Sequence, residues 1–439
     1  MAKIPIRTNK KIKLAKKLLD ELFFKYASDL VDLISDIIYK NLYIKTVNIT
    51  CWYINIYSLY FSLRENNMNL DFSDEQKFLK EEAKKFLTNE EALKKARNVM
   101  ENDDAHFDND LWEKIVELGW TGIRIPESYD GLGLSHLELC VIAEELGKSL
   151  APTPFSSSVY IFTEFLINFA NDEIKENLLP ALVSGEAIGT FAVTEDLMAP
   201  TEENINTSVS DDGKIFGKKI AIPDAKIATH LIVIAKHSSG VQLRLVDLSD
   251  ESVSIDYQKT IDETRAHYSV SFNNTPSLLV GSKSDGWSHY NHVINQSAVL
   301  FAFEQVGGAE ATLEMATNYA KERYAFGRPI GSYQAIKHKL SDMYVALTLA
   351  RSNCYYAAWA LNSESADFEL AAATARVSST KAFNLCSQEN IQTHGGNGFT
   401  WEYDCHLYYK RAKLLSVNIG SLKNWKNKLV NNLEKSNTH

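Results

Sequence analysis

Three long helical segments dominate the last third of the chain and constrain its fold more than any other feature. Apolar residues recur at three- to four-residue spacing through Val293–Arg323, Tyr333–Asn362 and Phe368–Gln392, with few residues that break helices. Long helices joined by short connections pack as antiparallel neighbours, so the pattern predicts an up-down-up helical bundle. We place this C-terminal α-bundle domain at residues 283–439.

Two other segments precede the bundle, and the hydrophobic period changes between them. Residues 68–187 have helical spacing, for example in Leu111–Leu118 and Leu137–Leu146, the latter ending at Gly147. Residues 188–282 hold short β-rich runs such as Leu231–Ala235, bounded by Asp-Asp-Gly, Ser-Ser-Gly and Asn-Asn turns. The order predicts an α+β fold, with an N-terminal α domain (68–187), a middle antiparallel β domain (188–282) and the bundle.

Composition excludes several classes of protein. The net charge of −10 and the pI near 5.6 disfavour a nucleic-acid partner. The five cysteines are scattered without C-x-x-C spacing, so we expect reduced thiols in a cytoplasmic protein. The 11 histidines show no ligand spacing, which argues against a metal site.

Residues 1–67 differ from the rest of the chain, and we treat them as an atypical N-terminal extension. They carry a net charge of +5, whereas residues 68–439 carry −15. The stretch Leu42–Leu63 is aromatic and Ile-rich, and it is nearly long enough to cross a bilayer, although Lys45 and several polar residues weaken that interpretation. Three interpretations stay open: upstream sequence fused by a misassigned start, an amphipathic membrane-surface segment, or a weak membrane anchor. Ser73 with Gln76 predicts a helix start soon after this segment.

Two motifs in the bundle suggest a nucleotide cofactor. The first is Arg323-Tyr324-Ala325-Phe326-Gly327, and the second is Gln392-Thr393-His394-Gly395-Gly396-Asn397-Gly398-Phe399. Glycines let the backbone approach a ligand closely, and the planar fork of an arginine suits a pyrophosphate. Gly307-Gly308 is no Rossmann fingerprint, because it lies inside a helical pattern rather than after a strand.

These motifs resemble the R-x-x-F-G and Q-x-x-G-G-x-G-[FY] segments of the acyl-CoA dehydrogenase family of flavoproteins. The resemblance covers nearly all of residues 68–439 and includes the ordered set W-x-x-x-x-x-L-G-W, P-E-x-x-G-G-x-G and E-E-L-G-[RK], in which Asp130 replaces one glycine. It implies an acyl-CoA substrate of fatty-acid or steroid type, FAD as cofactor, a tetramer, and an electron-transfer flavoprotein as acceptor. The residues it assigns to the ADP half of a neighbouring subunit's FAD are Arg323, Phe326, Gln334, Gln392, Gly395 and Gly396.

The same resemblance shows that the customary catalytic base is missing. Family members remove the α-proton of the thioester with a glutamate at one of two positions, and these fall on Ile419 and Ser297. Neither side chain is a general base. Glu304, two turns beyond Ser297, is a weak candidate for a displaced base. The better interpretation is that it is a structural carboxylate on the face of a helix.

The half of the site that holds the flavin ring is also altered. The family's T-E-P-x-x-G-S-D loop becomes Thr194–Thr201, in which Pro200 replaces the serine and removes a backbone N–H. An aromatic-Ile-[ST] strand becomes Ala221-Ile222-Pro223. Thr194, and Ser421 at the end of the segment that contains Ile419, stay candidate cofactor ligands.

Selective loss of the base and ring residues leads to a hypothesis. The segment Gly398–Ala412 resembles a version found in a subgroup of heteromeric acyl-CoA dehydrogenases, in which one subunit lacks the base. We expect this chain to be such a subunit, active with another acyl-CoA dehydrogenase chain in a heterotetramer. The alternatives are a homotetrameric enzyme with a displaced base, and a non-enzymatic acyl-CoA or interaction protein on the same fold.

Overall fold

The computed structural model describes residues 71–102 and 105–437 of this chain. They all belong to one compact unit, Asn69–His439. The extension at residues 1–67 lies outside the described residues, and so do the three interpretations of it. No helix in the described part combines the length and apolar character that a membrane-spanning helix needs.

The N-terminal part of the described chain is helical, as its spacing predicts. Ser73 and Gln76 form the predicted capping box at the start of the first helix, α4. Gly119, with φ of 72°, follows α6 in the left-handed region that favours glycine. The helices are α4 (Asp74–Asn89), α5 (Ala92–Glu101), α6 (Asn109–Glu117), α7 (His136–Ser149), α8 (Phe155–Ser157), α9 (Thr163–Phe169) and α10 (Asp172–Val183), with a π-helical turn at Ser158–Phe162 between α8 and α9.

The middle part is a twisted sheet of eight strands in the order β6-β7-β3-β2-β4-β5-β8, with β1 added beside β4. Most pairs are antiparallel, as predicted, but β1 and β2 each run parallel to β4. The pairing of β3 with β7 shifts register between Lys219 and Ile222, and Ala221 there has φ of 53°. The strands are β1 (Gly189–Ala192), β2 (Ser208–Val209), β3 (Lys214–Pro223), β4 (His230–His237), β5 (Gly240–Asp247), β6 (Val253–Gln258), β7 (His267–Pro276) and β8 (Leu278–Val280).

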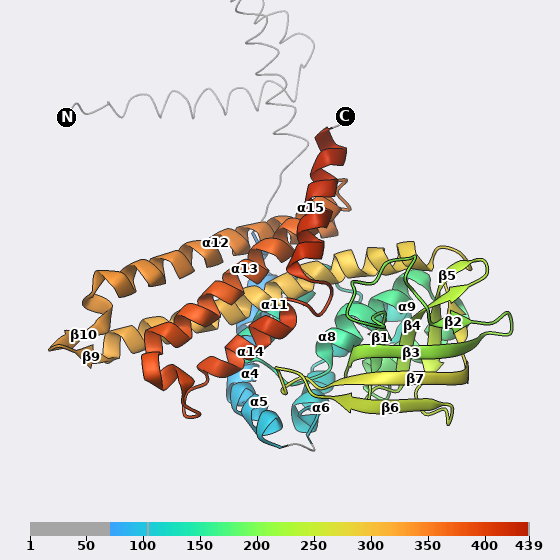
Figure 1. Cartoon of the computed structure of the whole chain (residues 1–439), viewed down its shortest axis with the longest axis horizontal. Helices are drawn as coiled ribbons and strands as arrows, with labels where there is room; N and C mark the ends of the chain where they lie inside the picture. The colour runs from blue at the N-terminus through green and yellow to red at the C-terminus, as the bar shows by residue number, and fades with distance from the viewer. Residues whose placement is uncertain (1–70, 103–104, 438–439) are drawn as a thin grey trace, which may run out of the picture. The chain divides into compact units, whose positions relative to one another are not determined.

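The C-terminal part is the predicted bundle. Figure 1 shows α11 (Gly286–Glu322), α12 (Gln334–Asn362) and α13 (Phe368–His394) side by side, with the sheet beyond the start of α11. A two-stranded hairpin of β9 (Tyr324–Ala325) and β10 (Arg328–Pro329) connects α11 to α12, and α14 (Cys405–Leu415) and α15 (Leu422–Asn437) complete the chain. The helix–sheet–helix order confirms the predicted α+β fold class, while the domain boundaries stay predictions.

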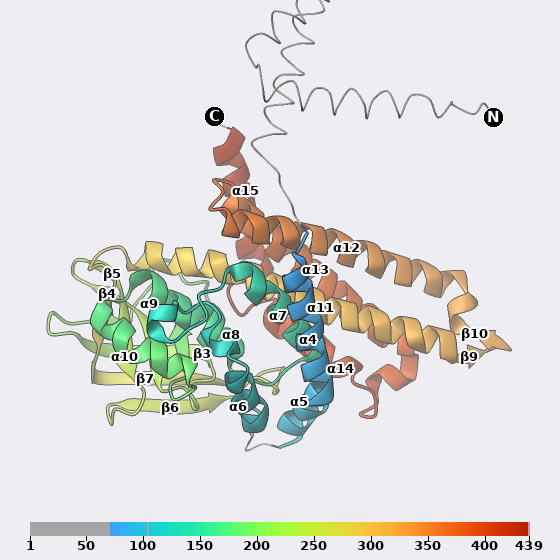
Figure 2. The ribbon, with the colours of Figure 1, turned by 180° about the vertical axis from the view of Figure 1, so that it is seen from behind.

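Helices α7 and α11 pack so closely that glycine is required on both. Figure 2 shows α4 and α7 lying across the bundle from behind. A Cβ atom on Gly307 would lie 1.9 Å from the carbonyl oxygen of Glu144, and one on Gly147 would lie 2.0 Å from that of Glu304. The expectation that Gly147 ends its helix is wrong, because α7 continues to Ser149 and the glycine instead lets the two backbones meet.

We therefore expect Gly307→Ala to destabilise the fold. The added methyl group would push α7 away from α11, and overpacking of this kind costs about 1–3 kcal/mol. The midpoint of chemical denaturation measures the effect. Gly396→Ala is the matched control, because a Cβ there meets nothing within 4 Å; equal shifts in the two variants would contradict this account of the helix packing.

Candidate functional site

The two predicted cofactor motifs lie together at one end of the bundle. Arg323 follows α11 and donates its backbone N–H to the carbonyl of Tyr319 at 2.8 Å. The side chain of Tyr319 stacks on His394, with ring centroids 4.1 Å apart, and its hydroxyl accepts from Nδ2 of Asn397 at 3.0 Å. Tyr319 thus joins the first motif to the second, although about 70 residues separate them.

This end of the bundle presents an exposed surface, which we call the bundle-end surface. Phe326 is 98% exposed on the β9–β10 turn and has φ of 51°, a costly conformation for a bulky residue. Gly395 and Gly396 are exposed, with open space where a Cβ would stand. Backbone strain beside an exposed ring and open glycines is typical of a surface that receives a ligand or another chain. The six residues of this surface are Arg323, Phe326, Gln334, Gln392, Gly395 and Gly396.

A second group of predicted residues lines a small cavity, the Ile419 cavity, between the sheet and the bundle. Ile419 lies beside Ala221 and Pro223, which the irregular pairing of β3 brings to the same wall. The cavity has a volume of about 20 Å³, room for about one water molecule. A flavin ring needs a pocket of hundreds of Å³, so the residues present do not fit it. The other lining residues are Ser156, Ser157, Ile161, Phe191, Arg265, His267, Phe301, Leu414 and Asn418.

Ser297 is buried and has a structural task. Its hydroxyl donates to the carbonyl of Tyr160 or Val293, each at 2.8 Å. Tyr160 lies in the π-helical turn, where the helical hydrogen-bond ladder is disturbed. Ser297 is thus occupied by backbone carbonyls, and neither it nor Ile419 offers a proton acceptor.

Glu304 is fully buried in an ion-pair network. Its Oε1 atom accepts from Nη2 of Arg265 at 2.5 Å and lies 3.5 Å from Nη1 of Arg411. Arg411 also pairs with Asp262 at 2.6 Å and donates to Thr264 at 2.6 Å. We call Asp262, Arg265, Glu304 and Arg411 the charge network. Arg265 lines the Ile419 cavity, whereas Glu304 is not among the lining residues and pairs with Arg265.

A third buried arginine holds the segment that carries Ile419. Arg376 donates to the carbonyl of Leu415 and, at 2.8 Å, to Oδ1 of Asn418. Burial lowers the pKa of Arg376 to about 9, opposed by the charge of Glu304. Sequence analysis missed Arg265, Arg376 and Arg411, because only the fold brings together arginines from a β-domain loop and two helices.

The altered Thr194–Thr201 loop is held by Glu195. Its carboxylate accepts from the backbone N–H groups of Asn206 and Thr207 at 2.7 and 2.8 Å and pairs with Nζ of Lys219 at 2.7 Å. Burial would raise the pKa of Glu195, but the bonds from Lys219 and Thr207 outweigh it and hold the pKa at about 2. Burial has the opposite effect on a lysine, and it lowers the pKa of Lys219 to about 8.

The two remaining candidate ligands do not line the Ile419 cavity. The carbonyl of Thr194 accepts from the backbone N–H of Ile220 at 2.8 Å. The hydroxyl of Ser421 pairs with Asn424 at the start of α15. Their role as cofactor ligands stays a prediction.

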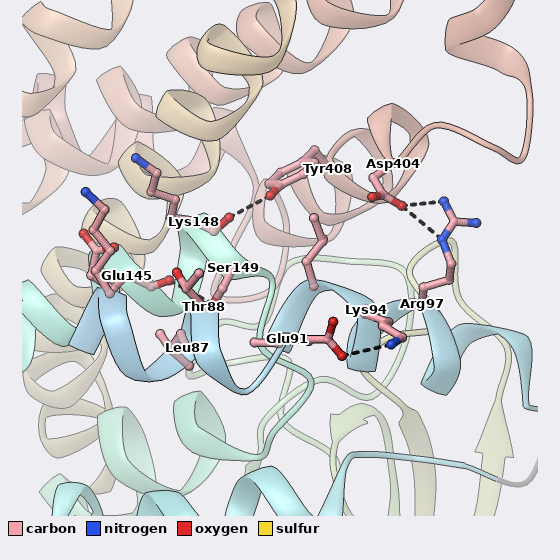
Figure 3. Close-up of a pocket in the computed structure, with 13 residues that line it drawn as sticks. Leu87, Thr88, Glu91, Lys94, Arg97, Glu145, Lys148, Ser149, Asp404 and Tyr408 are labelled. Atoms are coloured by element: carbon pink, nitrogen blue, oxygen red, sulfur yellow. Dashed lines mark hydrogen bonds and ion pairs between the residues drawn. The ribbon is translucent and has the colours of Figure 1, made fainter. Parts of the chain in front are cut away.

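A larger cavity of about 470 Å³ lies among α4, α5, α7 and α14, away from all the predicted residues. Figure 3 shows two ion pairs among its lining residues, Arg97 with Asp404 and Lys94 with Glu91, the latter at 2.9 Å. The hydroxyl of Tyr408 donates to the carbonyl of Lys148 at 2.7 Å. Four of the charged side chains that line this cavity are therefore already paired with each other.

No group of three His, Cys, Asp or Glu side chains in residues 71–102 and 105–437 could hold a metal ion. Four cysteines, Cys140, Cys354, Cys386 and Cys405, are buried and free, and Cys51 lies outside the described residues.

Comparison with known proteins identifies the family. Residues 73–186 match the acyl-CoA dehydrogenase N-terminal domain, and residues 284–423 match its C-terminal domain. The chain is 30% identical to "Probable acyl-CoA dehydrogenase YngJ" of Bacillus subtilis, over 81% of this chain and 96% of that protein. It is 31% identical to "Acyl-CoA dehydrogenase IpdE2" of Mycobacterium tuberculosis, over 70% of this chain and 82% of that protein.

A solved structure, that of a variant of the "Tcur3481-Tcur3483 steroid ACAD", is 25% identical, with a TM-score of 0.75 over 83% of this chain and 99% of that chain. The present chain therefore belongs to the acyl-CoA dehydrogenase family of flavin-dependent oxidoreductases.

We expect Glu304→Gln to act on stability first. Loss of the negative charge leaves the buried guanidinium of Arg265 without its ionised partner, whereas Arg411 keeps Asp262, and breaking a buried pair in this way costs about 3–5 kcal/mol. Urea denaturation measures the change. Glu314→Gln is the control, because Glu314 is half exposed and its pair with Lys148 is worth about 0–1 kcal/mol. A Glu304→Gln chain of unchanged stability that loses turnover would instead identify Glu304 as a displaced base.

The low pKa of Glu195 predicts a dependence on acid. The folded-state pKa lies below the ordinary value of 4.5, so the stabilisation is complete above pH 4.5 and is lost as the pH falls toward 2. We expect urea stability to fall less between pH 6 and 3.5 in Glu195→Gln than in the parent chain. A variant at exposed Glu117 should behave like the parent, and parallel curves for all three proteins would refute the assignment.

Proposed function

We propose that this chain is the base-lacking subunit of a heteromeric, FAD-dependent acyl-CoA dehydrogenase. It contributes the bundle-end surface to the FAD of a partner subunit, and its own ring site is closed. The complex would form an α,β-double bond in an acyl-CoA thioester of fatty-acid or steroid type. The observation that supports the proposal is the 20 Å³ cavity at Ile419, together with the exposure of the bundle-end residues that the family resemblance assigns to ADP binding.

The bundle-end surface fits the ADP half of FAD. The guanidinium of Arg323 is exposed and would pair with the pyrophosphate, since Arg–phosphate bonds are among the strong charge-assisted ones. The open space above Gly395 and Gly396 would let the backbone approach the nucleotide. When bound, FAD supplies the acceptor for the hydride that leaves the β-carbon. This chain's part is to bind and orient the nucleotide end.

The Ile419 cavity does not support chemistry on this chain's own FAD. Ile419 and Ser297 stand at the two customary base positions, and neither takes up a proton. Glu304 does not line the cavity, and its carboxylate is paired with Arg265, which does. The solved relative whose name joins two gene products, Tcur3481 and Tcur3483, is consistent with a paired assembly in this part of the family. An electron-transfer flavoprotein as acceptor, and a cytoplasmic location, stay predictions from the resemblance and the sequence.

Two alternatives make different demands on the same surfaces. A homotetramer with a displaced base must bind the flavin ring in each chain, and this requires a pocket much larger than the Ile419 cavity, whose volume is about 20 Å³. A non-enzymatic protein on this fold has no use for Arg323 beside an exposed Phe326 on a strained turn. Both are weaker than the heteromeric proposal on these grounds.

We expect the purified full chain to contain little flavin and to reduce no dye with a panel of acyl-CoAs. Co-expression with a dehydrogenase chain encoded beside it should give a complex with about one FAD per two chains. Absorbance after denaturation measures the flavin. One FAD per chain with turnover, in the absence of any partner, would overturn the proposal.

We also expect Arg323→Ala to weaken FAD binding in that complex by about 10- to 100-fold, because a charge-assisted bond to phosphate is lost. FAD retention during gel filtration and flavin fluorescence measure it. Arg328→Ala, on the same hairpin but with its guanidinium over the ring of Tyr333 at 4.0 Å, should retain FAD. Equal loss in the two variants would show that the hairpin, not Arg323, is what matters.

A further inference from the structure

Glu145 on α7 is a buried carboxylate in the wall of the 470 Å³ cavity, which we call the Glu145 cavity. It is 3% exposed, and the described residues donate no hydrogen bond to its carboxylate. It forms a long ion pair with Lys80, at 3.8 Å, whose Nζ atom is already bonded to Glu144 at 2.7 Å. Figure 3 shows Glu145 at one end of the lining and the pair of Arg97 and Asp404 at the other. A carboxylate removed from water without a donor is a group to which a ligand can bind.

Glu145 carries the excess charge of a network of ion pairs that joins α4, α7, α11 and α12. Each of the other carboxylates in this network has a cation within 3.3 Å, whereas the contact of Glu145 is 3.8 Å long. Glu145 is therefore the carboxylate that its surroundings neutralise least. The three cations are Lys80, Lys148 and Arg351, and the four carboxylates are Glu144, Glu145, Glu310 and Glu314.

The other charged side chains of the lining do not change this balance. The two ion pairs shown in Figure 3 each contribute one charge of either sign. Lys84, the remaining lining cation, has a half-exposed side chain and lies 4.0 Å from the carboxylate of Glu81. The cavity with its ion-pair partners thus keeps at least one uncompensated negative charge when Glu145 is ionised.

The empty cavity opposes that ionisation. Burial is the largest effect, and it raises the pKa of Glu145 to about 7. The charges of Lys80 and Lys148 act in the opposite direction. The charges of Glu144 and Glu310 add to the effect of burial. A cation bound beside Glu145 would favour the ionised carboxylate, so cation binding and proton release are linked.

The size and the apolar part of the lining indicate what kind of cation fits. Leu87 on α4 and Ala92 and Leu93 on α5 line the cavity. A volume of about 470 Å³ is ordinary for a small-molecule site. A divalent metal ion needs several oxygen ligands, whereas an organic ammonium ion needs one counter-ion and an apolar surface for its chain. One free carboxylate beside apolar side chains favours the organic cation.

We propose that the Glu145 cavity binds a small organic ammonium ion, a primary amine on a short apolar chain. The carboxylate of Glu145 pairs with the ammonium group, and Leu87, Ala92 and Leu93 contact the chain. Binding near neutral pH releases a proton from Glu145. The site is independent of the proposed heteromeric function, because it shares no residue with the bundle-end surface or the Ile419 cavity.

The test is calorimetric titration of the full chain with propylamine, butylamine and hexylamine, up to about 10 mM, at pH 6 and pH 8. The amines stay charged over this range. We expect at least one to bind about tenfold more tightly at pH 8, because the ionised fraction of Glu145 rises about tenfold across its pKa. The alcohol of the same chain length should bind at least about tenfold more weakly at pH 8, since it forms no charge-assisted bond.

Glu145→Gln keeps the shape of the side chain and removes its charge. This variant should lose the pH dependence and the preference for amine over alcohol. It should fold, because the parent chain already holds Glu145 largely neutral below pH 7, and thermal denaturation checks this. Glu81→Gln is the matched control, since Glu81 lies near Lys84 but does not line the cavity, and it should bind as the parent does.

Three results overturn the proposal. The first is that none of the three amines binds at pH 8. The second is that the parent and Glu145→Gln bind the amine with the same affinity and the same pH dependence. The third is that the alcohol binds the parent as tightly as the amine, which would identify an apolar cavity in which Glu145 has no part.

Discussion

The buried charge network is the interaction on which the rest of the structure depends. Glu304 comes from the long helix α11, Arg411 from α14, and Asp262 and Arg265 from the loop that leads into β7. Ionised groups without partners are costly in a dry interior, so these elements are held in one arrangement. The same network places Arg265 at the Ile419 cavity. An arginine that joins the helical and sheet parts therefore also lines the small cavity where the family resemblance would place the chemistry.

The site residues that match the family's motifs and those that depart from them lie in different parts of the molecule. At the Ile419 cavity, apolar side chains such as Ile419 and Pro223 stand where the family resemblance leads one to expect catalytic and ring-binding residues. The bundle-end residues stay exposed and make few contacts within their own chain, so the stability of this fold does not explain their presence. If the bundle-end surface does not stabilise its own chain, the best explanation for it is that another subunit binds there. This asymmetry is the physical basis for the heteromeric proposal.

Much of the fold could be predicted from sequence because periodicity is local. The three bundle helices and the Ser73 cap follow from spacing and capping chemistry alone. Periodicity does not say which apolar residues face solvent, and Phe78 is 67% exposed. The motifs indicated the bundle-end surface, but the three buried arginines could not be found, because their partners lie up to 149 residues away. Gly147 was misjudged because a glycine looks the same at a helix end and at a helix crossing.

The strained turn at Phe326 has a consequence for the life of the chain in a cell. Phe326 is 98% exposed and Tyr324 on the same hairpin is 63% exposed, so the turn presents two aromatic rings that a chaperone could bind. Burial of such a ring in an assembly is worth about 1.5–3 kcal/mol. Copies of this chain that are not assembled with the proposed partner subunit would be held by chaperones and degraded by proteases. The abundance of this chain would then follow that of its partner.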